Sequence, residues 1–565
     1  MDKKMKIPYG QAHFETVRKN NFLYVDKTHF IEELEEIEKI IYLRPRRFGK
    51  SLFLSMLDCY YDVAKADQFE DLFGGLHIHE NPTENHHHYY ILRFDFSAMT
   101  GTTDAPIERV FRQQVWLDVE RFINRYELGI ELGERTTATA GGILETVLAK
   151  FENLKLGKKV YVMIDEYDNF TNSMLKGNAS DFFTVLQKGG FIRSFYESMK
   201  KGVGSGIVER LFMTGVMSVS LDTMTSGFNI ATNVTTDVFF ADMMGFTSDE
   251  VKHLLQQLGL AAQEQEKTYE ILRQNYNGYL FSDESETRVF NATLILYYLK
   301  YYTRMKRAPR ELVDTNLNQS KTTIKNIVEL KNKKENNELI KEIVQNKEVS
   351  GNLSTFIDLV EKFDKNDVIT LLFNIGLLTI QKPGVLTTFK MPNKVIETIY
   401  FQYLSELAKR QAHDVLDVGK QEAAIQALGE NGDIEPLTNL VAEFLALTSN
   451  KNTRKFDEKY IKLVYMMLLS SSHQFMAYDE FQAKQGFSDI VILKSPASYA
   501  KYEMIIELKY IQKGKRTDQK IESKFQEGIK QINDYMKDPR LGDRPDLKKF
   551  IVIFSGFDVV KLVEL

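Results

Sequence analysis

The segment Arg44-Pro45-Arg46-Arg47-Phe48-Gly49-Lys50-Ser51 constrains the fold most, because it joins an apolar run to an amphipathic stretch. The run EKIIYL (38–43) is typical of a buried strand, and SLFLSMLDCYYDV (51–63) is predicted to be helical. A Gly-Lys-Ser turn between strand and helix is typical of a phosphate-binding loop. Lys50 would neutralise phosphate charge there and Ser51 would bind Mg²⁺. The predicted nucleotide-contacting residues of this loop are Arg46, Arg47, Phe48, Gly49, Lys50 and Ser51.

One position departs from the general phosphate-loop pattern G-x-x-x-x-G-K-[ST]. Arg44 occupies the place of the first glycine, and an arginine pays more than glycine for a positive φ. The structural alternative is a helix start whose basic residues are merely solvated. The loop alone therefore leaves both interpretations open.

A second motif favours nucleotide binding. The apolar run 160–164 ends in Asp165-Glu166, and a carboxylate at the C-terminal end of such a strand faces the crevice where α/β sheets bind ligands. We expect Asp165 to hold hydrated Mg²⁺ and Glu166 to orient and polarise the attacking water. Asp168 is interpreted as a cap rather than a catalyst, and Thr214 is a candidate sensor residue.

The first 300 residues alternate short apolar runs with helical stretches of about 15 residues, which is typical of a mostly parallel sheet covered on both faces. A strand over 89–97 separates the two motifs along the sequence. The predicted fold class is α/β, with an N-terminal P-loop ATPase domain of the additional-strand class over residues 1–300. Helices are also expected over 104–127 and 181–200.

Composition changes near residue 300, where lysine and arginine begin to outnumber acidic residues up to residue 347. This basic stretch is interpreted as a solvated helical face, although it could also follow a nucleic-acid backbone. Short helices around a hairpin-like turn (377–392) predict a helical or winged-helix-like middle region over 301–450.

The tail carries a different set of polar residues. Asp489 lies early in one predicted strand, and Glu507 and Lys509 lie toward the end of the next. Side chains alternate along a strand, so Glu507 and Lys509 share a face, and a hairpin would bring Asp489 beside them. Two carboxylates and an ammonium suit a Mg²⁺-dependent phosphodiesterase. Asp489 and Glu507 are the predicted metal ligands, with the Leu508 carbonyl as a further candidate.

The order of elements supports this interpretation over an ordinary charged hairpin. A helix (456–470), three strands, a polar helix (517–537) and a final strand (549–556) follow the order of a restriction-endonuclease-like α/β core, predicted over residues 451–565. Lys509 would help to activate water and stabilise the developing charge. Glu458 is a candidate additional ligand, and Gln531 is a candidate orienting residue.

Composition excludes several other classes of protein. A formal net charge of −5 argues against a polycation that coats nucleic acid, and the single cysteine, Cys59, excludes a disulfide within the chain and a cysteine-clustered zinc site. The longest apolar segments of the sequence are too short to cross a bilayer, and the start has no apolar h-region, so no secretory leader is expected. The expected protein is soluble and cytoplasmic, with no membrane partner.

These motifs together resemble a known architecture, the bacterial and archaeal AAA-ATPase-like proteins with a C-terminal PD-(D/E)XK nuclease domain. The likeness spans nearly the whole chain, and Arg44 matches the form usual in this family. The segments that carry it are RPRRFGKS (44–51), VMIDEYDN (162–169), FMTGVMSVS (212–220), YNGYLFS (276–282), MPNKVIETIY (391–400), FSDIVI (487–492), IIELKY (505–510) and KQINDY (530–535), with IPYGQAHFETVRKNNFLYVDKT (7–28) before them.

The resemblance implies ATP binding at Lys50 and Ser51, Mg²⁺ and hydrolysis roles at Asp165 and Glu166, and nuclease roles at Asp489, Glu507 and Lys509. The expected cofactors are ATP and Mg²⁺, with Mn²⁺ as an alternative in the nuclease site. The expected partners are ATP and nucleic acid, with DNA favoured over RNA, and a homo-oligomer is compatible with the sequence. Two other functions stay open: an ATP-dependent switch or scaffold whose tail binds nucleic acid without cutting, and a DNA-binding regulator acting through residues 353–410.

Overall fold

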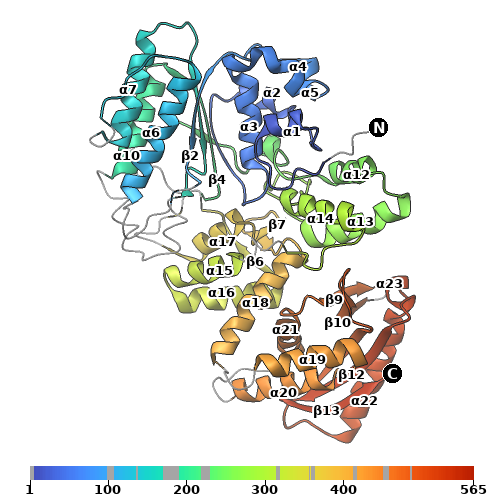
Figure 1. Cartoon of the computed structure of the whole chain (residues 1–565). Helices are drawn as coiled ribbons and strands as arrows, with labels where there is room; N and C mark the ends of the chain where they lie inside the picture. The colour runs from blue at the N-terminus through green and yellow to red at the C-terminus, as the bar shows by residue number, and fades with distance from the viewer. Residues whose placement is uncertain are drawn as a thin grey trace. The chain divides into compact units, whose positions relative to one another are not determined.

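The computed structural model describes residues 6–97, 99, 107–134, 138–169, 190–217, 230–313, 319–354, 357, 363–411, 417–449, 457–483 and 486–565. The chain divides into two compact units (Figure 1). Unit 1 comprises Met1–Lys300, Thr323–Leu339 and Glu348–Lys394, and unit 2 comprises Tyr301–Thr322, Ile340–Lys347 and Val395–Leu565. The division into three domains at residues 300 and 450 stays a prediction.

Unit 1 contains a parallel sheet in the order β2-β3-β4-β1-β5. Its strands are β1 (Lys39–Leu43), β2 (Tyr90–Asp95), β3 (Val160–Asp165), β4 (Val208–Gly215) and β5 (Thr232–Asn233). Every residue of β3 is buried, as expected for a strand covered on both faces. In space the strand between β1 and β3 is β4, whereas β2 lies at the sheet edge. The α/β fold class with a P-loop-type sheet is confirmed.

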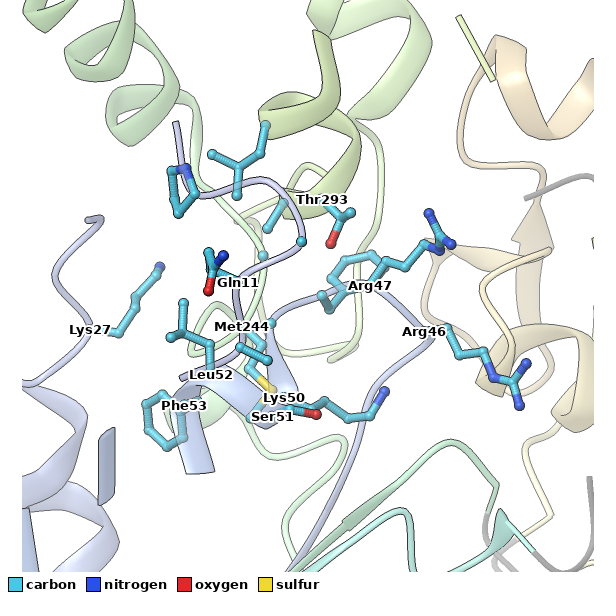
Figure 2. A pocket seen from close by; sticks show the side chains of 18 of the residues that line it. Gln11, Lys27, Arg46, Arg47, Lys50, Ser51, Leu52, Phe53, Met244 and Thr293 are labelled. Atoms are coloured by element: carbon cyan, nitrogen blue, oxygen red, sulfur yellow. The ribbon is translucent and has the colours of Figure 1, made fainter. Parts of the chain in front are cut away.

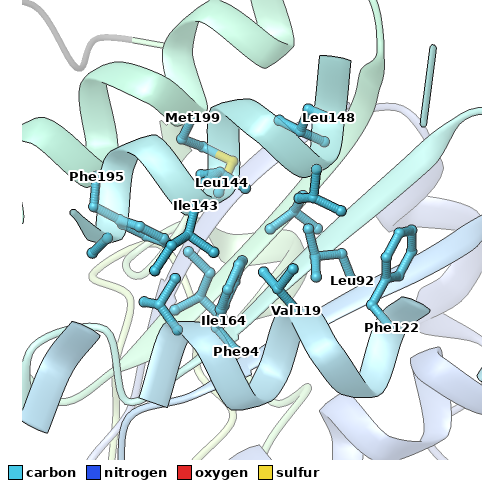
Figure 3. Close-up of a cluster of buried hydrophobic side chains, with 14 of the residues drawn as sticks. Leu92, Phe94, Val119, Phe122, Ile143, Leu144, Leu148, Ile164, Phe195 and Met199 are labelled. Carbon is cyan, nitrogen blue, oxygen red and sulfur yellow. The ribbon is translucent and has the colours of Figure 1, made fainter. Parts of the chain in front are cut away.

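Helices cover both faces of this sheet. Figure 1 shows α6 (Ile107–Arg125), α7 (Ala140–Asn153) and α10 (Phe191–Gly204) together on one side, and α3 (Lys50–Tyr61) on the other. Figure 3 shows the core under the first group, where Phe94 and Ile164 from the strands meet Val119, Leu144 and Phe195 from the helices. Burying one such side chain contributes about 2 kcal/mol. Part of the helix expected over 181–200 lies outside the described residues.

The remaining elements of the N-terminal part are short or lie around the sheet. They are α1 (Phe14–Lys19), α2 (Phe30–Glu35), η1 (Val63–Gln68), α4 (Phe69–Phe73), α5 (His77–Glu80), η2 (Val238–Phe240), α12 (Ser248–Gln257) and α13 (Ala262–Tyr276). Four helices contain residues of both units: α14 (Ala292–Met305), α15 (Gln319–Leu330), α16 (Lys333–Asn346) and α18 (Lys394–Gln411). No described helix is both long enough and apolar enough to span a membrane.

A small antiparallel sheet also belongs to unit 1. It has the order β6-β8-β7 and consists of β6 (Glu348–Gly351), β7 (Thr379–Lys382) and β8 (Thr387–Lys390). The hairpin predicted within 377–392 is confirmed by the pairing of β7 with β8. Helix α17 (Lys365–Asn374) precedes it and begins with a capping box made by Asp364 and Asp367.

Unit 2 contains a mixed sheet in the order β13-β12-β11-β10-β9. Only the β11–β12 pair is parallel. The strands are β9 (Phe475–Ala483), β10 (Gly486–Lys494), β11 (Glu503–Ile511), β12 (Leu547–Ser555) and β13 (Asp558–Glu564). The helices are α19 (Val418–Asn431), α20 (Glu435–Ser449), α21 (Glu458–Leu469), α22 (Asp518–Tyr535) and α23 (Pro539–Gly542).

The predicted order of helix, three strands, helix and strand is confirmed for α21, β9, β10, β11, α22 and β12. The expectation that the strand over 549–556 is the last one is wrong, because β13 follows it and pairs with β12. Residues of β13 are half-buried or exposed, so this edge strand lacks the continuous apolar run that marks a central strand.

Candidate functional sites in the two units

The phosphate loop of unit 1 has the backbone form that binds anions. Gly49 has φ 102° and precedes α3, and Arg47 has φ 74°. No side chain caps the N-terminus of α3, whereas Asp457 and Thr517 cap α21 and α22. The first N–H groups of a helix lack partners within the helix, so an uncapped start can bind phosphate oxygens.

Two backbone hydrogen bonds hold this loop in place. The amide of Gly245 donates to the Phe48 carbonyl at 3.1 Å, and the amide of Thr293 donates to the Arg47 carbonyl at 3.1 Å. Both donors come from segments far along the sequence, so the loop shape depends on residues that the local motif does not contain. The left-handed conformation of Arg47, which is rare for a residue with a Cβ, is stabilised in this way.

Arg44 has a structural role. The expectation that its position requires a positive φ is wrong, because the left-handed residues of the loop are Arg47 and Gly49. Its side chain is 1% exposed, and its guanidinium lies 4.2 Å from the ring centroids of both Tyr42 and Phe281. Nη1 donates to the carbonyls of Leu43 (2.9 Å) and Thr235 (2.6 Å), and Nη2 donates to that of Phe240 (2.9 Å). Arg44 therefore joins β1 to residues 235–240.

Lys50 is a buried cation with neutral hydrogen-bond partners. The side chain is 6% exposed, and Nζ donates to the carbonyls of Arg44 at 2.9 Å and Pro45 at 3.0 Å. Burial lowers the pKa of Lys50, and the carboxylates of Glu166 and Asp165 oppose that shift. An ammonium held by carbonyls keeps its positive charge available to an incoming anion.

Asp165 lies at the end of β3, with a hydrogen bond from Ser51 and with Nη2 of Arg93 3.7 Å from Oδ2. Burial raises the pKa of Asp165, while Ser51 and Arg93 lower it. Within the described parts of the chain, Asp165 Oδ1 and Thr214 Oγ1 are buried atoms with no hydrogen-bond partner. A carboxylate oxygen without a partner beside a serine hydroxyl suits a hydrated Mg²⁺.

Glu166 lines the cavity next to the loop and has φ 52°, a conformation that is strained for a residue with a Cβ. Burial raises its pKa, against the opposing charges of Lys50 and Arg46. Asp168 instead bonds the backbone: its carboxylate accepts from the amides of Val216 (3.1 Å) and Met217 (2.7 Å). These bonds join the end of β3 to the segment that follows β4, and the interpretation of Asp168 as a helix cap stays a prediction.

A cavity of about 860 Å³ lies over the loop. Figure 2 shows Gln11 and Lys27 on one side and Arg46 on the other, with Lys50 and Ser51 between them. The predicted contact residues Arg46, Arg47, Phe48, Gly49, Lys50 and Ser51 all line it. The wall beyond the loop is mainly apolar and is formed by Leu23, Met243, Met244, Phe246 and Leu296. The cavity thus combines a basic end with an apolar end, as a nucleotide requires.

The sequence placed one part of the far wall of this cavity without giving it a role. Residues 26–28 were expected at the entry to the nucleotide pocket, and Lys27 lines the cavity. Its Nζ donates to the Asp242 carbonyl at 2.9 Å and pairs with Glu250. The charge at Lys27 was visible in the sequence, but its position near Met244 depends on contacts over more than 200 residues.

In unit 2, β10 and β11 bring the predicted nuclease residues together. The antiparallel register pairs Ile490 with Ile506, which continues to Asp489 opposite Glu507. Glu507 is 1% exposed, and its Oε1 lies 2.6 Å from Lys509 Nζ. The two carboxylates and the ammonium predicted from the sequence are therefore neighbours.

On the side of β11 that faces β10, two carboxylates accept the hydrogen bonds that a partner strand would otherwise accept. The Leu508 amide donates to Asp489 Oδ2 at 3.0 Å, and the Tyr510 amide donates to Glu458 Oε1 at 3.0 Å. These bonds satisfy N–H groups that the β10–β11 ladder does not reach, since its recorded pairs end at Ile490 and Ile506. Because the β10–β11 ladder ends before these residues, the side chains of Asp489, Glu507 and Glu458 face a common space.

The electrostatics of Glu507 differ from those of an ordinary surface carboxyl. Burial and then repulsion from Asp489 raise the pKa of Glu507 to about 8, with Lys509 opposing the shift. Glu507 Oε2 and Gln531 Oε1 are buried, and neither has a hydrogen-bond partner among the described residues. A divalent cation beside Asp489 and Glu507 would satisfy Oε2 and reduce the repulsion, so these two residues fit a metal.

Glu458 does not complete a metal-binding triad. No set of three or more histidine, cysteine, aspartate or glutamate side chains in the described ranges is arranged to hold a metal ion. Its carboxylate instead supports the backbone at Tyr510. The sequence also missed Lys462, which lies one helical turn after Glu458 and whose Nζ is 3.3 Å from Asp489 Oδ1. The four-residue spacing was the available signal, since it places both residues on one helical face.

Comparison with known proteins finds two separate family matches, one in the N-terminal part of the chain and one at its C-terminal end. Residues 8–225 match a family described as "Predicted AAA-ATPase". Residues 456–564 match the PD-(D/E)XK nuclease superfamily.

A curated relative, "Uncharacterized protein in vnfD 5'region" of Azotobacter chroococcum mcd 1, is 27% identical over 299 residues, 52% of each chain. The chain therefore spans about half the length of that relative. The two family matches agree with the architecture inferred from the motifs: the N-terminal part of the chain is similar to predicted AAA-ATPases, and its C-terminal part is similar to the PD-(D/E)XK nuclease superfamily.

Proposed function

We propose that the chain hydrolyses ATP in unit 1 and cleaves nucleic-acid phosphodiesters with a metal-dependent site in unit 2, with DNA as the favoured substrate. The observation that carries the nuclease assignment is the buried Glu507 Oε2, which faces the Asp489 charge without a partner among the described residues. The ATPase assignment is supported by the uncapped start of α3 next to Lys50.

In the ATPase site, the loop amides and Lys50 bind the β- and γ-phosphates. Ser51 and Asp165 would hold Mg²⁺, which neutralises charge on the phosphates when bound. Glu166 orients the attacking water and accepts its proton. The hydroxyl of Thr214 can donate to that water or to a phosphate oxygen, because Oγ1 has no partner among the described side chains.

In the nuclease site, Asp489 and Glu507 would hold Mg²⁺ or Mn²⁺, which polarises the phosphodiester and its attacking water when bound. Lys509 lies beside Glu507 and faces the same space, so its ammonium stabilises negative charge that develops on the phosphate. Gln531 orients a water or phosphate oxygen through the oxygen that has no partner among the described residues.

One observation favours a second candidate, an ATP-dependent switch or scaffold with a non-cleaving tail. Asp489 and Glu507 already have lysine partners, and the described residues contain no triad of metal ligands. Such a site could bind nucleic acid weakly through Lys462 and Lys509 without metal.

The two functions separate in one experiment. The full chain is incubated with linear DNA, circular DNA and RNA, in Mg²⁺ or Mn²⁺, with and without ATP. We expect cleavage that Lys509→Ala abolishes and that ATP changes only when Lys50 is intact, with Lys50→Ala as the matched variant. Absence of cleavage under every condition, with ATP still bound, would establish the switch or scaffold instead.

A further inference from the structure

Lys462 lies in the nuclease site, although no motif includes it. It is on α21, and its residue is 9% exposed. Nζ lies 3.3 Å from Asp489 Oδ1 and 3.4 Å from Glu480 Oε1. Glu480 is about half exposed, so Asp489 is the more buried of its two anionic partners.

The lysine uses the Asp489 oxygen that a metal would need. Oδ2 of Asp489 accepts from the Leu508 amide, and Oδ1 faces Lys462. A bound Mg²⁺ lies about 2.1 Å from its ligand oxygens, so it and the ammonium would be two close cations at one carboxylate. Their repulsion means that metal binding and the Lys462–Asp489 pair oppose each other.

A displaced Lys462 needs another anion, because a mostly buried ammonium is costly without a partner. Glu480 lies 3.4 Å away but is half exposed, and solvent weakens such a pair. The anion that enters this site with the metal is a phosphate of the nucleic acid. Its non-bridging oxygens can accept from a lysine that stays on the rigid helix α21.

We propose that Lys462 is a phosphate-binding residue of the nuclease site that occupies Asp489 as a tethered counterion until a metal replaces it. This inference rests on the proposed nuclease function of unit 2. It differs from the role given to Lys509, whose partner is Glu507 at 2.6 Å. Lys462 thus pairs with Asp489 and Lys509 pairs with Glu507, and nucleic acid would bind both lysines.

The proposal predicts opposite effects on two ligands. Lys462→Met in the full chain should bind Mn²⁺ about 3- to 10-fold more tightly in the absence of nucleic acid, measured by electron paramagnetic resonance, because the competing charge is gone. The same variant should bind an oligonucleotide in Ca²⁺ about 10-fold more weakly by fluorescence anisotropy. The slope of log affinity against log salt should fall by about one, as for one lost phosphate contact.

Lys494→Met is the matched control. Lys494 lies at the other end of β10 and pairs with Asp546 at 2.8 Å, so its removal deletes an equivalent charge away from the acidic cluster. We expect this control to leave Mn²⁺ affinity unchanged. Lys462→Arg should restore nucleic-acid binding in part, and Lys462→Gln provides a second neutral variant if Lys462→Met fails to fold.

Weaker Mn²⁺ binding by both neutral variants would overturn the proposal, because Lys462 would then merely position Asp489. An unchanged salt slope would overturn its phosphate-binding part. The proposed function fails separately: a wild-type chain that binds Mn²⁺ and oligonucleotide but cuts nothing is a binding module, and the opposite effects of Lys462→Met would still be measured in it.

Discussion

Lys50 at the start of α3 and Lys509 near the end of β11 are both buried lysines, yet their hydrogen-bond partners differ. Lys50 donates to two carbonyls, whereas Lys509 pairs with the Glu507 carboxylate at 2.6 Å. The first ammonium is solvated by neutral dipoles and keeps its charge for a ligand. The second neutralises one acid of a cluster whose other members are Asp489 and Glu458. The site proposed for ATP is therefore suited to an anion, and the site proposed for phosphodiester cleavage is suited to a cation.

The backbone follows the same contrast. At α3 the helix start has no capping side chain, so its N–H groups are open to a phosphate. At β11 the amides of Leu508 and Tyr510 already donate to carboxylates, so they fix the acids in place. At α3 the backbone donors are available to a bound phosphate. At β11 the backbone donors instead orient the carboxylate oxygens of the protein itself.

The largest expected effect tests whether the two sites recognise opposite charges. Lys50→Gln should reduce ATP hydrolysis by about 10²- to 10³-fold, because the transition-state phosphates lose a buried cation. Glu507→Gln should reduce cleavage by at least as much and abolish Mn²⁺ binding in unit 2. Phosphate release and oligonucleotide cleavage are measured on both variants.

Each of these variants is the control for the other. Lys50→Gln should leave Mn²⁺ binding by Glu507 and Asp489 intact, and Glu507→Gln should leave binding of a fluorescent ATP analogue intact. Loss of both activities in either single variant would contradict two separately built sites.

A smaller effect is expected from Arg44, the other buried cation beside the phosphate loop. Arg44→Met should lower the free energy of unfolding of unit 1 by about 3 kcal/mol, because it leaves buried carbonyls without their donors. Calorimetry measures this loss in the transition that ATP shifts upward, since a ligand stabilises the unit that binds it.

Arg46→Met is the control for this prediction, because Arg46 is exposed and lies two residues away. We expect it to change stability by less than about 0.5 kcal/mol while weakening ATP binding. Equal destabilisation by the two substitutions would show that Arg44 has no special structural role.

The sequence predicted the parts of both sites that depend on neighbouring residues. Gly49-Lys50-Ser51 after a strand, and Glu507 and Lys509 on one strand face, are local patterns with a fixed geometry. Arg44 could not be understood locally, because its partners Thr235 and Phe240 lie about 190 residues away. The strand β13 was missed for a different reason: a half-exposed edge strand has no distinctive apolar run.

Asp118 provides a buried charge outside both sites. It lies on α6, where burial raises its pKa to about 6 against hydrogen bonds from Gln114 and the Asp95 amide. Lys50 and Lys509 carry charges that a ligand can use, whereas the charge of Asp118 costs stability, because burial outweighs its ion pair with Arg121 at 2.7 Å. At Asp118 the free-energy cost of burying a charge can therefore be measured without any role of that charge in ligand binding.

The pH dependence of stability should reveal this cost. The pKa of Asp118 is higher in the folded chain than the ordinary value of 3.8, so the folded state holds its proton more tightly. Stability is then full below pH 4, falls as pH rises through 6, and is constant above about pH 7, with a total loss of about 3 kcal/mol. Asp118→Asn should remove this slope from the ATP-shifted calorimetric transition. A slope that persists in Asp118→Asn would assign the loss to other groups and leave Asp118 without a measurable cost.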